Sequence, residues 1–509
     1  MEDFEKPETA VSPSCMSTEN VLTKLDVERN FSVIGLTTTK LSTASICSQN
    51  AFTWVKNSLC MTDIILASMG PLEYHLSFRD AFLCGMVGTL LGVVPVAFVS
   101  TFGPQSGHST TVINRSLMGW FPATALAMLT VVAILGSLTI ELILAGQILS
   151  GIVDHGSFST SAAIVVSAIF TGVVSVIGIK KQIALEDYTL FAQILAMFIL
   201  SSAATSYVNY PQPGATLSSV QLQDTLLLGR RVLFSSLCMT RSIAYSLVAA
   251  DVTSDDAISP NTGYILAQCV TGLLSAFSFT LVIGASLGAR VVETATWQDT
   301  YEKSTGLLIA EILRPLGSRA KDLCGMVLVI GILLRMIKAV SCIYPSLYAL
   351  TPRLKSVPTP IYPTVIMPAC VLFAVLGMSH LSELMTSIVL ITGYCTVIWF
   401  TIFLIEHFLF RSFTRPKGEQ DLRDGEALFP YGLASSASFV IGYIVSVLSM
   451  TQSWYIGPLA SISDIAGLDV SHHRSSPTFL SLMATTNSSR WSLDVQALLL
   501  SIHCCATLK

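Results

Sequence analysis

Residues 331–352, GILLRMIKAVSCIYPSLYALTP, read as the middle of a membrane span that two basic side chains interrupt. A run of roughly 20 apolar residues crosses the hydrocarbon core as a helix, because backbone polar groups in lipid must be satisfied within the segment. An ionisable group inside such a run is costly unless it faces a polar cavity or a partner. The stretch therefore predicts a membrane helix whose Arg335 and Lys338 face the inside of a helical bundle.

The composition extends this prediction to the whole chain. Of the 509 residues, 52% are hydrophobic and 12% are charged, against about 25% charged residues in an ordinary soluble protein. The net charge of -4 is small, which argues against a nucleic-acid partner. A polytopic membrane protein is expected, with the lipid bilayer and a small molecule as its partners.

Apolar runs of membrane-spanning length recur along the chain and predict an all-α fold with about 11 or 12 transmembrane helices. The expected spans are 52–70, 81–100, 120–150, 161–178, 187–207, 232–250, 263–288, 323–350, 361–379, 384–405 and 430–449.

The two ends differ in character from the middle. Residues 1–50 are polar, and their lysines and arginines favour the cytoplasmic side, so a disordered cytoplasmic tail is expected. Residues 461–509 are rich in serine and contain no apolar run long enough to cross a membrane. They predict a divergent, disordered C-terminal tail without a clear twelfth span, which leaves residues 51–460 as the transmembrane domain.

Acidic residues also occur inside the predicted spans. Asp63 lies in the first span, Glu141 in the third and Asp251 at the end of the sixth. A helix break near Ser58 and Cys60 in the first span would expose backbone donors and acceptors to a ligand, as broken helices do in membrane transporters. We expect Asp63, Glu141 and Asp251 to be candidate coupling groups that bind the proton. Two other roles for Asp251 stay open, a cap of the next helix or a gate on the cytoplasmic side.

Five motifs occur in order along the chain: VPVAFVSTFGPQSGHSTTVINRSLMGW (94–120), AGQILSGI (145–152), YSLVAAD (245–251), IEHFLFR (405–411) and QSWYIGPLA (452–460). Together they resemble the fungal purine–cytosine permeases of the nucleobase–cation symporter family 1. The resemblance implies two inverted five-helix repeats followed by two extra helices. It places a substrate site between broken first and sixth helices and the third, eighth and tenth.

The same resemblance implies uptake of a purine, cytosine or related heterocycle across the plasma membrane, with a proton as the coupling ion and no other cofactor. It offers no reason to expect an enzyme, and the sequence contains no nucleophile–base or metal-ligand constellation.

The site residues implied by the resemblance depart from the family pattern. In the third span, Ser137 and Glu141 occupy positions where the family carries Trp and Asn. The resemblance also implies that Tyr245 replaces a stacking Trp. In the eighth span the family's amide-rich stretch corresponds to Lys338, Ala339, Ser341 and Cys342.

These replacements exchange neutral amides for charges. Because an isolated buried charge is costly, the sequence leads to the hypothesis that Glu141 and Lys338 form an ion pair across the substrate cavity. Ser58 completes the predicted substrate-binding set through its place at the expected helix break.

Two alternatives to a nucleobase carrier remain open at this stage. The charges could serve a nucleoside or another charged or zwitterionic metabolite. The weak twelfth span could instead mark a non-transporting sensor or a degenerate copy.

Overall fold

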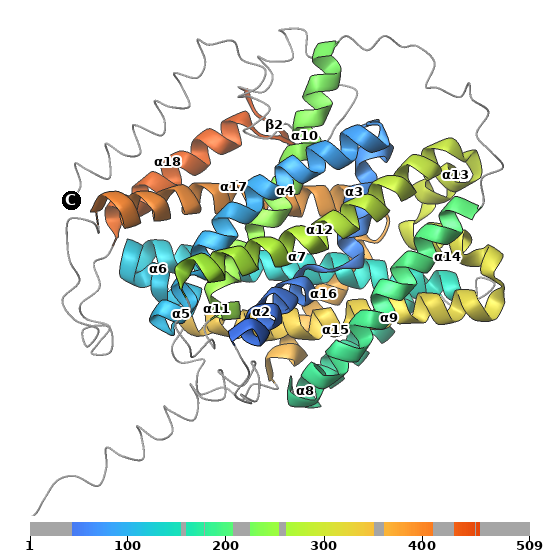
Figure 1. Ribbon diagram of the computed structural model, residues 1–509, viewed down its shortest axis with the longest axis horizontal. Coiled ribbons are helices and arrows are strands. Elements are labelled where there is room, and N and C mark those ends of the chain that lie inside the picture. The colour runs from blue at the N-terminus through green and yellow to red at the C-terminus, as the bar shows by residue number, and fades with distance from the viewer. Residues whose placement is uncertain are drawn as a thin grey trace, which may run out of the picture. The chain divides into compact units, whose positions relative to one another are not determined.

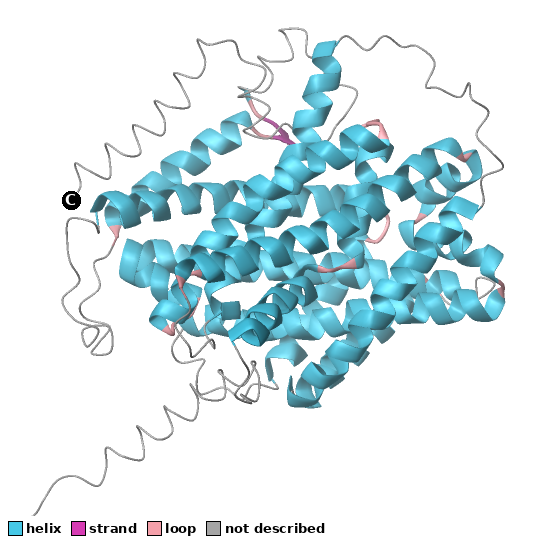
Figure 2. Cartoon of the chain, in the orientation of Figure 1, coloured by secondary structure: helices cyan, strands magenta, loops and turns pink. Residues whose placement is uncertain are grey.

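The computed structural model describes residues 43–153, 159–177, 179–206, 224–253, 261–350, 361–410, 432–452 and 455–458. Almost all of these residues are helical, as Figure 2 shows, and the described part contains one short antiparallel β-hairpin. The predicted all-α fold is confirmed. The predicted tails up to residue 42 and over 461–509 lie outside the described residues.

The helices of the described residues are drawn and labelled in Figure 1. The long helices and their partners are α2 (Thr43–Ser58), α3 (Met61–Leu72), α4 (Phe78–Ser100), α7 (Trp120–Ile152), α8 (Thr160–Ile177), α9 (Ile179–Ser206), α10 (Asp224–Ile243), α12 (Thr262–Glu293), α15 (Ser318–Leu350), α16 (Ile361–Gly377), α17 (Leu381–Ile405) and α18 (Leu433–Ser449). The short elements are α5 (Phe102–Ser106), α6 (Thr110–Met118), η1 (Ala244–Val248), α11 (Ala249–Thr253), α13 (Ala295–Lys303), α14 (Thr305–Leu313), η2 (Arg314–Leu316), η4 (Glu406–Phe410), β1 (Thr451–Gln452) and β2 (Tyr455–Ile456).

The helices account for each of the eleven predicted spans. Among the described residues, six stretches are long and apolar enough to cross a membrane by length and composition: Phe78–Ser106, Trp120–Ile152, Leu227–Thr253, Thr262–Glu293, Ser318–Tyr344 and Leu381–Leu409. Shorter apolar helices occupy the other five positions, namely Met61–Leu72, Thr160–Val176, Leu190–Ala204, Ile361–Gly377 and Leu433–Ser449. The first span differs at its start, because α2 already begins at Thr43, inside the predicted N-terminal tail.

The first span is broken where the sequence predicts a break. Helix α2 ends at Ser58 and α3 begins at Met61, with Cys60 in extended conformation between them (φ -144°, ψ 149°). The Ser58 hydroxyl donates to the Trp54 carbonyl at 2.7 Å. A serine that bonds back to its own helix competes with the main-chain ladder, which helps α2 to end here.

The sixth span also loses its α-helical geometry halfway. Helix α10 ends at Ile243, a 3₁₀ turn covers Ala244–Val248, and α11 continues from Ala249. A 3₁₀ segment inside a long helix often marks a functional hinge. Both non-α segments are buried, since Cys60 and Leu247 are nearly inaccessible to solvent.

Small residues let the helices approach closely around these breaks. Helix α12 packs against α3, and a Cβ atom added at Gly284 or Gly288 would collide with the main-chain oxygen of Ile64 or Ser68. Small residues at such crossings are typical of membrane helix packing.

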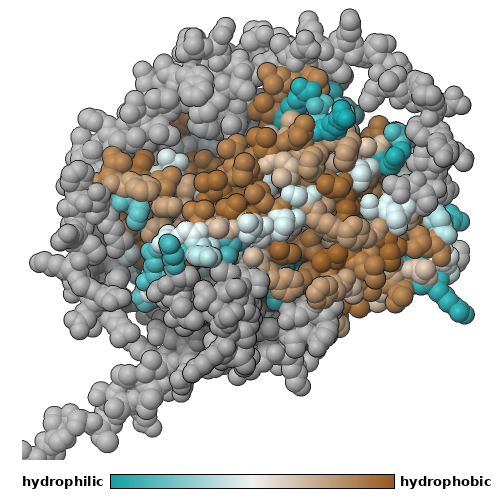
Figure 3. All heavy atoms as spheres, in the orientation of Figure 1, coloured by the Kyte–Doolittle hydropathy of each residue, from teal (hydrophilic) through white to brown (hydrophobic). Residues whose placement is uncertain are grey.

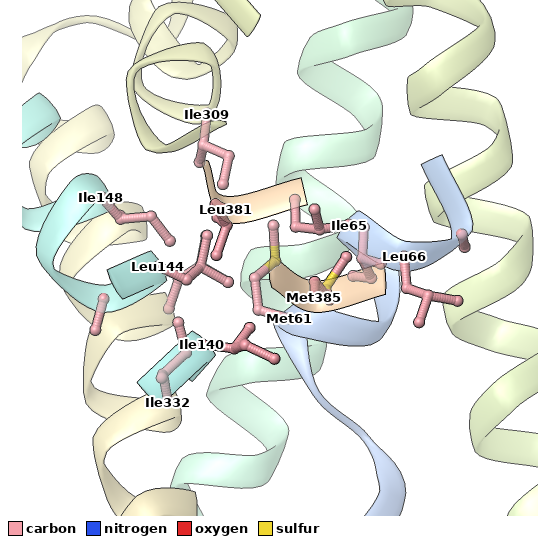
Figure 4. Close-up of a cluster of buried hydrophobic side chains, with 14 of the residues drawn as sticks. Met61, Ile65, Leu66, Ile140, Leu144, Ile148, Ile309, Ile332, Leu381 and Met385 are labelled. Atoms are coloured by element: carbon pink, nitrogen blue, oxygen red, sulfur yellow. The ribbon is translucent and has the colours of Figure 1, made fainter. Parts of the chain in front are cut away.

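Apolar side chains fill the space beside the break in the first span. Figure 4 shows Met61 and Ile65 of α3 facing Ile140 and Leu144 of α7, with Met385 of α17 beside them. On the outside, apolar atoms cover most of the helical surface visible in Figure 3, and hydrophilic atoms gather toward helix ends. A surface of this kind suits contact with lipid rather than water.

Candidate functional site

The end of α2 provides the first part of the site. The main-chain oxygen of Asn57 accepts hydrogen bonds from Arg335 Nη1 at 2.9 Å and from the Tyr245 hydroxyl at 3.5 Å. The Asn57 side-chain oxygen accepts from Lys338 Nζ. The last carbonyls of a helix carry partial negative charge, so these contacts place two cations at the C-terminal end of the first half-helix.

The start of α3 provides a buried carboxylate. Asp63 Oδ1 accepts from Arg241 Nε at 2.6 Å, and the Asp63 residue is 3% exposed. Arg241 lies in the last turn of α10, so the ion pair joins the two broken spans. Its guanidinium also stands over the Tyr245 ring, 5.1 Å from the centroid, in the range of a cation–π contact.

A second buried ion pair joins α7 to α15, which lie side by side (Figure 1). Arg335 Nε donates to Glu141 Oε1 at 2.7 Å. The predicted pair between Glu141 and Lys338 is therefore wrong: among the described residues, the cation that pairs with the carboxylate is Arg335, and the Cys60 thiol also donates to Glu141 Oε1 at 3.8 Å. Arg335 and Lys338 are three residues apart and share a helix face, so the sequence alone does not choose between them.

Tyr245 connects the two ion pairs. Its hydroxyl oxygen accepts from Arg241 Nη2 at 3.3 Å and from Arg335 Nη2 at 3.2 Å. The ring packs edge-on against Phe277 of α12, with centroids 5.9 Å apart. Asp63, Arg241, Tyr245, Arg335 and Glu141 thus form a continuous chain of contacts, which we call the central network.

Each carboxylate of the central network has one oxygen without a partner. Asp63 Oδ2 and Glu141 Oε2 are buried and accept no hydrogen bond from the described residues. A small cavity of about 10 Å³ opens beside the pair of Asp63 and Arg241, which is close to the space that one water molecule needs. Thr89 and Thr280 are among the residues that line it.

The structure brings Asp63, Glu141 and Tyr245 of the predicted site into one network and places Lys338 beside it through Asn57. Two other predicted residues use their hydroxyls within their own helices. Ser58 donates to Trp54, and Ser341 donates to the Ile337 carbonyl at 3.2 Å.

The remaining predicted residues take no part in the contacts that define the central network. Ser137 is exposed, one helical turn before Glu141 on the same face of α7. Ala339 and Cys342 are partly buried on α15. Asp251 contacts a different element, since its Oδ1 accepts from the main-chain N–H of Thr110 at 2.8 Å, at the first residue of α6. This contact caps α6, which precedes Asp251 in the chain, whereas the N-cap of the next helix, α12, is Asn261.

Sequence reasoning missed two members of the site. Arg241 lies inside the predicted sixth span, four residues before Tyr245, and a basic residue within an apolar run is the signal that could have found it. Asn57 carries no such signal, because its contribution comes mainly from a main-chain carbonyl that the helix break exposes.

Within the described ranges, no three His, Cys, Asp or Glu side chains gather in a way that could hold a metal ion. The polar groups at the centre are instead guanidinium, carboxylate, phenol and carbonyl groups. They suit hydrogen bonding to a small polar molecule between two broken helices. The apolar spans and this buried polar centre together define a polytopic membrane carrier.

Comparisons with known proteins agree with this class. Residues 42–466 match the family described as permeases for cytosine/purines, uracil, thiamine and allantoin. The chain is 23% identical over 454 residues to the vitamin B6 transporter TPN1 of Saccharomyces cerevisiae, with 79% of this chain and 77% of that protein covered. It is 25% identical over 412 residues to the purine-cytosine permease fcyB of Emericella nidulans, covering 80% and 78% of the two chains.

The fold is shared with the transporter Mhp1. The inward-facing structure of Mhp1 superposes with a TM-score of 0.59 at 14% identity, covering 85% of this chain and 95% of Mhp1. A closed structure with bromovinylhydantoin bound, described as a nucleobase-cation-symport-1 family transporter, gives a TM-score of 0.57 at 13% identity, covering 89% and 95%. The protein belongs to the family of permeases for cytosine/purines, uracil, thiamine and allantoin, and it is a multi-pass membrane transporter rather than an enzyme.

Proposed function

We propose that the protein carries a nucleobase-sized heterocycle together with a proton across the plasma membrane. The observation that carries this proposal is the central network, which lies between the breaks of the first and sixth spans. The purine-cytosine permeases among its relatives support a heterocyclic substrate. The hydantoin bound to Mhp1 is a small ring with several donors and acceptors, which is the kind of ligand this centre can bind.

The break residues give the site its hydrogen-bonding capacity. At Leu59 and Cys60 the chain is not helical. The Leu59 N–H still donates to the Val55 carbonyl at 2.9 Å, and the Cys60 carbonyl accepts from the Asp63 N–H at 3.3 Å, so we assign substrate binding at the break to the Leu59 carbonyl and the Cys60 N–H. Tyr245 supplies an aromatic face at the second break, although its ring also contacts Arg241 and Phe277. A flat heterocycle could stack on this face while its edge bonds to the charged groups.

We assign the access path to one face of α7. Ser137 and Glu141 share one face of this helix, and the face is exposed at Ser137 but nearly inaccessible at Glu141, which is 4% exposed. A passage that opens on one side and closes at the centre is what alternating access requires. We assign Ser137 to the entrance and Glu141 to the closed end.

Proton coupling is assigned to Glu141 and Asp63. Each has a buried oxygen with no partner among the described residues, and a proton on that oxygen would reduce the cost of burying it. Protonation of Glu141 would also weaken its hold on Arg335, since a neutral carboxyl attracts a guanidinium less than a carboxylate does. The proton and the substrate would then bind to linked parts of one network.

Uptake into cells that lack nucleobase transport of their own tests this proposal. We expect labelled cytosine, adenine or hypoxanthine, or a related heterocycle, to accumulate in cells that express the chain, and an uncoupler to abolish the accumulation. The Glu141→Gln variant should lose uphill accumulation while retaining exchange across the membrane, because an amide does not take up a proton at this position. A matched control is Glu311→Gln, at a surface ion pair with Arg314.

The proposal fails if no heterocycle accumulates. Proton coupling alone fails if Glu141→Gln, with the same amount of protein at the membrane, still concentrates the substrate.

A further inference from the structure

Two guanidinium groups of the central network meet at a single neutral oxygen. Arg241 Nη2 and Arg335 Nη2 donate to the same Tyr245 hydroxyl, at 3.3 Å and 3.2 Å. Two positive charges this close repel one another, and the repulsion is strong where water is scarce. A phenol carries no charge to offset it.

Each guanidinium group of the central network is also bonded to a carboxylate through its Nε atom. Asp63 binds Arg241 through Nε at 2.6 Å, and Glu141 binds Arg335 through Nε at 2.7 Å. Each carboxylate is bonded through Nε, while the Nη2 atoms of both arginines donate to the same hydroxyl. Arg335 is fixed further by its Nη1 contact with the Asn57 carbonyl.

This convergence suits a negatively charged oxygen better than a phenol. Guanidinium groups bind carboxylate and phosphate oxygens through planar, charge-assisted hydrogen bonds, roughly twice as strong as neutral ones. An anionic oxygen in place of the Tyr245 hydroxyl would also relieve the repulsion between the two arginines.

The free carboxylate oxygens impose a second requirement. Asp63 Oδ2 and Glu141 Oε2 are buried acceptors without a partner among the described residues, and a buried unsatisfied acceptor is costly. A ligand that places an N–H group against either oxygen would remove that cost. The two requirements together describe one molecule with an anionic oxygen and an N–H donor.

We infer that the substrate is a heteroaromatic acid: a nucleobase-like ring that carries an ionised oxygen group, bound between Arg241 and Arg335, and at least one N–H donor directed at Asp63 or Glu141. This inference rests on the proposed transport function and names its substrate class. On binding, the acid displaces the Tyr245 hydroxyl from the two guanidinium groups. The ring then lies against the aromatic side chains at the second break.

Matched pairs of ligands that differ mainly in charge test the inference. Orotate and uracil share one ring that carries N–H donors, as do uracil-5-carboxylate and thymine. We expect each acid to bind about 10-fold to 100-fold more tightly than its neutral counterpart, the range that a hydrogen bond to a charged group supplies. Binding is measured by ligand-induced thermal stabilisation of the purified full-length protein, and by competition in the uptake assay.

Paired variants keep the experiment interpretable, because a single neutral substitution would strand a buried charge. The pairs Arg335→Gln with Glu141→Gln, and Arg241→Gln with Asp63→Asn, each remove one guanidinium and its carboxylate together. Each pair should abolish the preference for the acid, whereas the exposed control Arg314→Gln should retain it.

The outcomes separate the inference from the proposed function. Transport of uracil or another neutral base with no preference for the acid overturns the inference and leaves the function standing. A preference for the acid that survives both paired variants overturns the assignment to Arg241 and Arg335. Absence of both binding and uptake for every heterocycle overturns the function and the inference together.

Discussion

Arg335 and Glu141 carry opposite charges inside the helical bundle, where leaving either charge without its partner costs free energy. The Glu141 residue is 4% exposed, and the Arg335 side chain is 21% exposed. A buried ion pair contributes little relative to an apolar pair, but breaking it from one side is expensive because the other charge remains. A comparison of the stabilities of the single and double variants is therefore more informative than any single substitution.

We expect Arg335→Gln alone to lower the free energy of unfolding by about 3–5 kcal/mol, because it leaves the Glu141 carboxylate unpaired. The double variant with Glu141→Gln should recover a large part of this loss. Thermal unfolding of the purified protein in detergent measures both. The exposed pair of Glu311 and Arg314 is the control, for which about 0–1 kcal/mol is expected. Additive losses in the double variant would show that the two residues do not depend on each other.

Tyr245 offers a separate test, because its hydroxyl can be removed while its ring stays. In Tyr245→Phe the contact with Phe277 persists, but Arg241 and Arg335 lose a shared acceptor. We expect the ligand-free protein to lose roughly 1–3 kcal/mol of stability, and a bound substrate to stabilise the variant at least as much as the natural protein. Loss of substrate stabilisation would mean that the hydroxyl itself binds the substrate.

At the scale of elements, the close crossing of α3 and α12 holds the first broken span in place. Gly284 and Gly288 face the main chain of α3, so there is no flexible side chain that could move aside for a larger residue. Helix α3 carries Asp63 in its first turn, and its position therefore determines where that carboxylate lies.

The substitution Gly284→Ala should separate the two helices and lower stability by about 1–3 kcal/mol, the usual range for overpacking. The measurement is again thermal unfolding, with the uptake rate recorded alongside. Gly229→Ala is a matched control in α10, because nothing lies within 4 Å of the added Cβ. It should be neutral or stabilising by up to about 1 kcal/mol. Equal effects of the two variants would contradict close packing at Gly284.

The sequence predicts the spans well because the bilayer sets one dominant rule, the length of an apolar run. It also predicts the break at Ser58 and Cys60. It does not predict which cation pairs with Glu141, since Arg335 and Lys338 share a face of α15 and only the position of α2 assigns Lys338 to Asn57. The 3₁₀ turn around Tyr245 was implied only by the family resemblance, as no residue there is a strong helix breaker.

At the scale of the whole molecule, Glu73 joins segments that are far apart in sequence. It follows the end of α3, accepts from the Tyr301 hydroxyl of α13 at 3.2 Å, and also bonds to Ser382 in the first turn of α17. Burial raises the pKa of the Glu73 carboxyl, and burial together with the neighbouring carboxylate raises the pKa of Tyr301. The folded protein therefore holds a proton at Glu73 more tightly than the unfolded chain does.

This difference sets the sign of a pH effect. The contribution of Glu73 to stability is fully present below its ordinary pKa, and it is lost as pH rises through the higher pKa of the folded state. Across that window, Glu73→Gln should unfold with a smaller dependence on pH than the natural protein. Unfolding temperatures recorded at a series of pH values check this. An unchanged pH profile in the variant would assign the effect to other groups.

Gln147 joins three segments through a single side chain. Its Nε2 donates to the Met378 carbonyl at 2.8 Å, and its Oε1 accepts from the main-chain N–H of Gly306 at 3.3 Å. The third span is thereby fastened to α14 and to the residues between α16 and α17. Movement of this end of the third span against α14 during a transport cycle would therefore have to break both Gln147 hydrogen bonds.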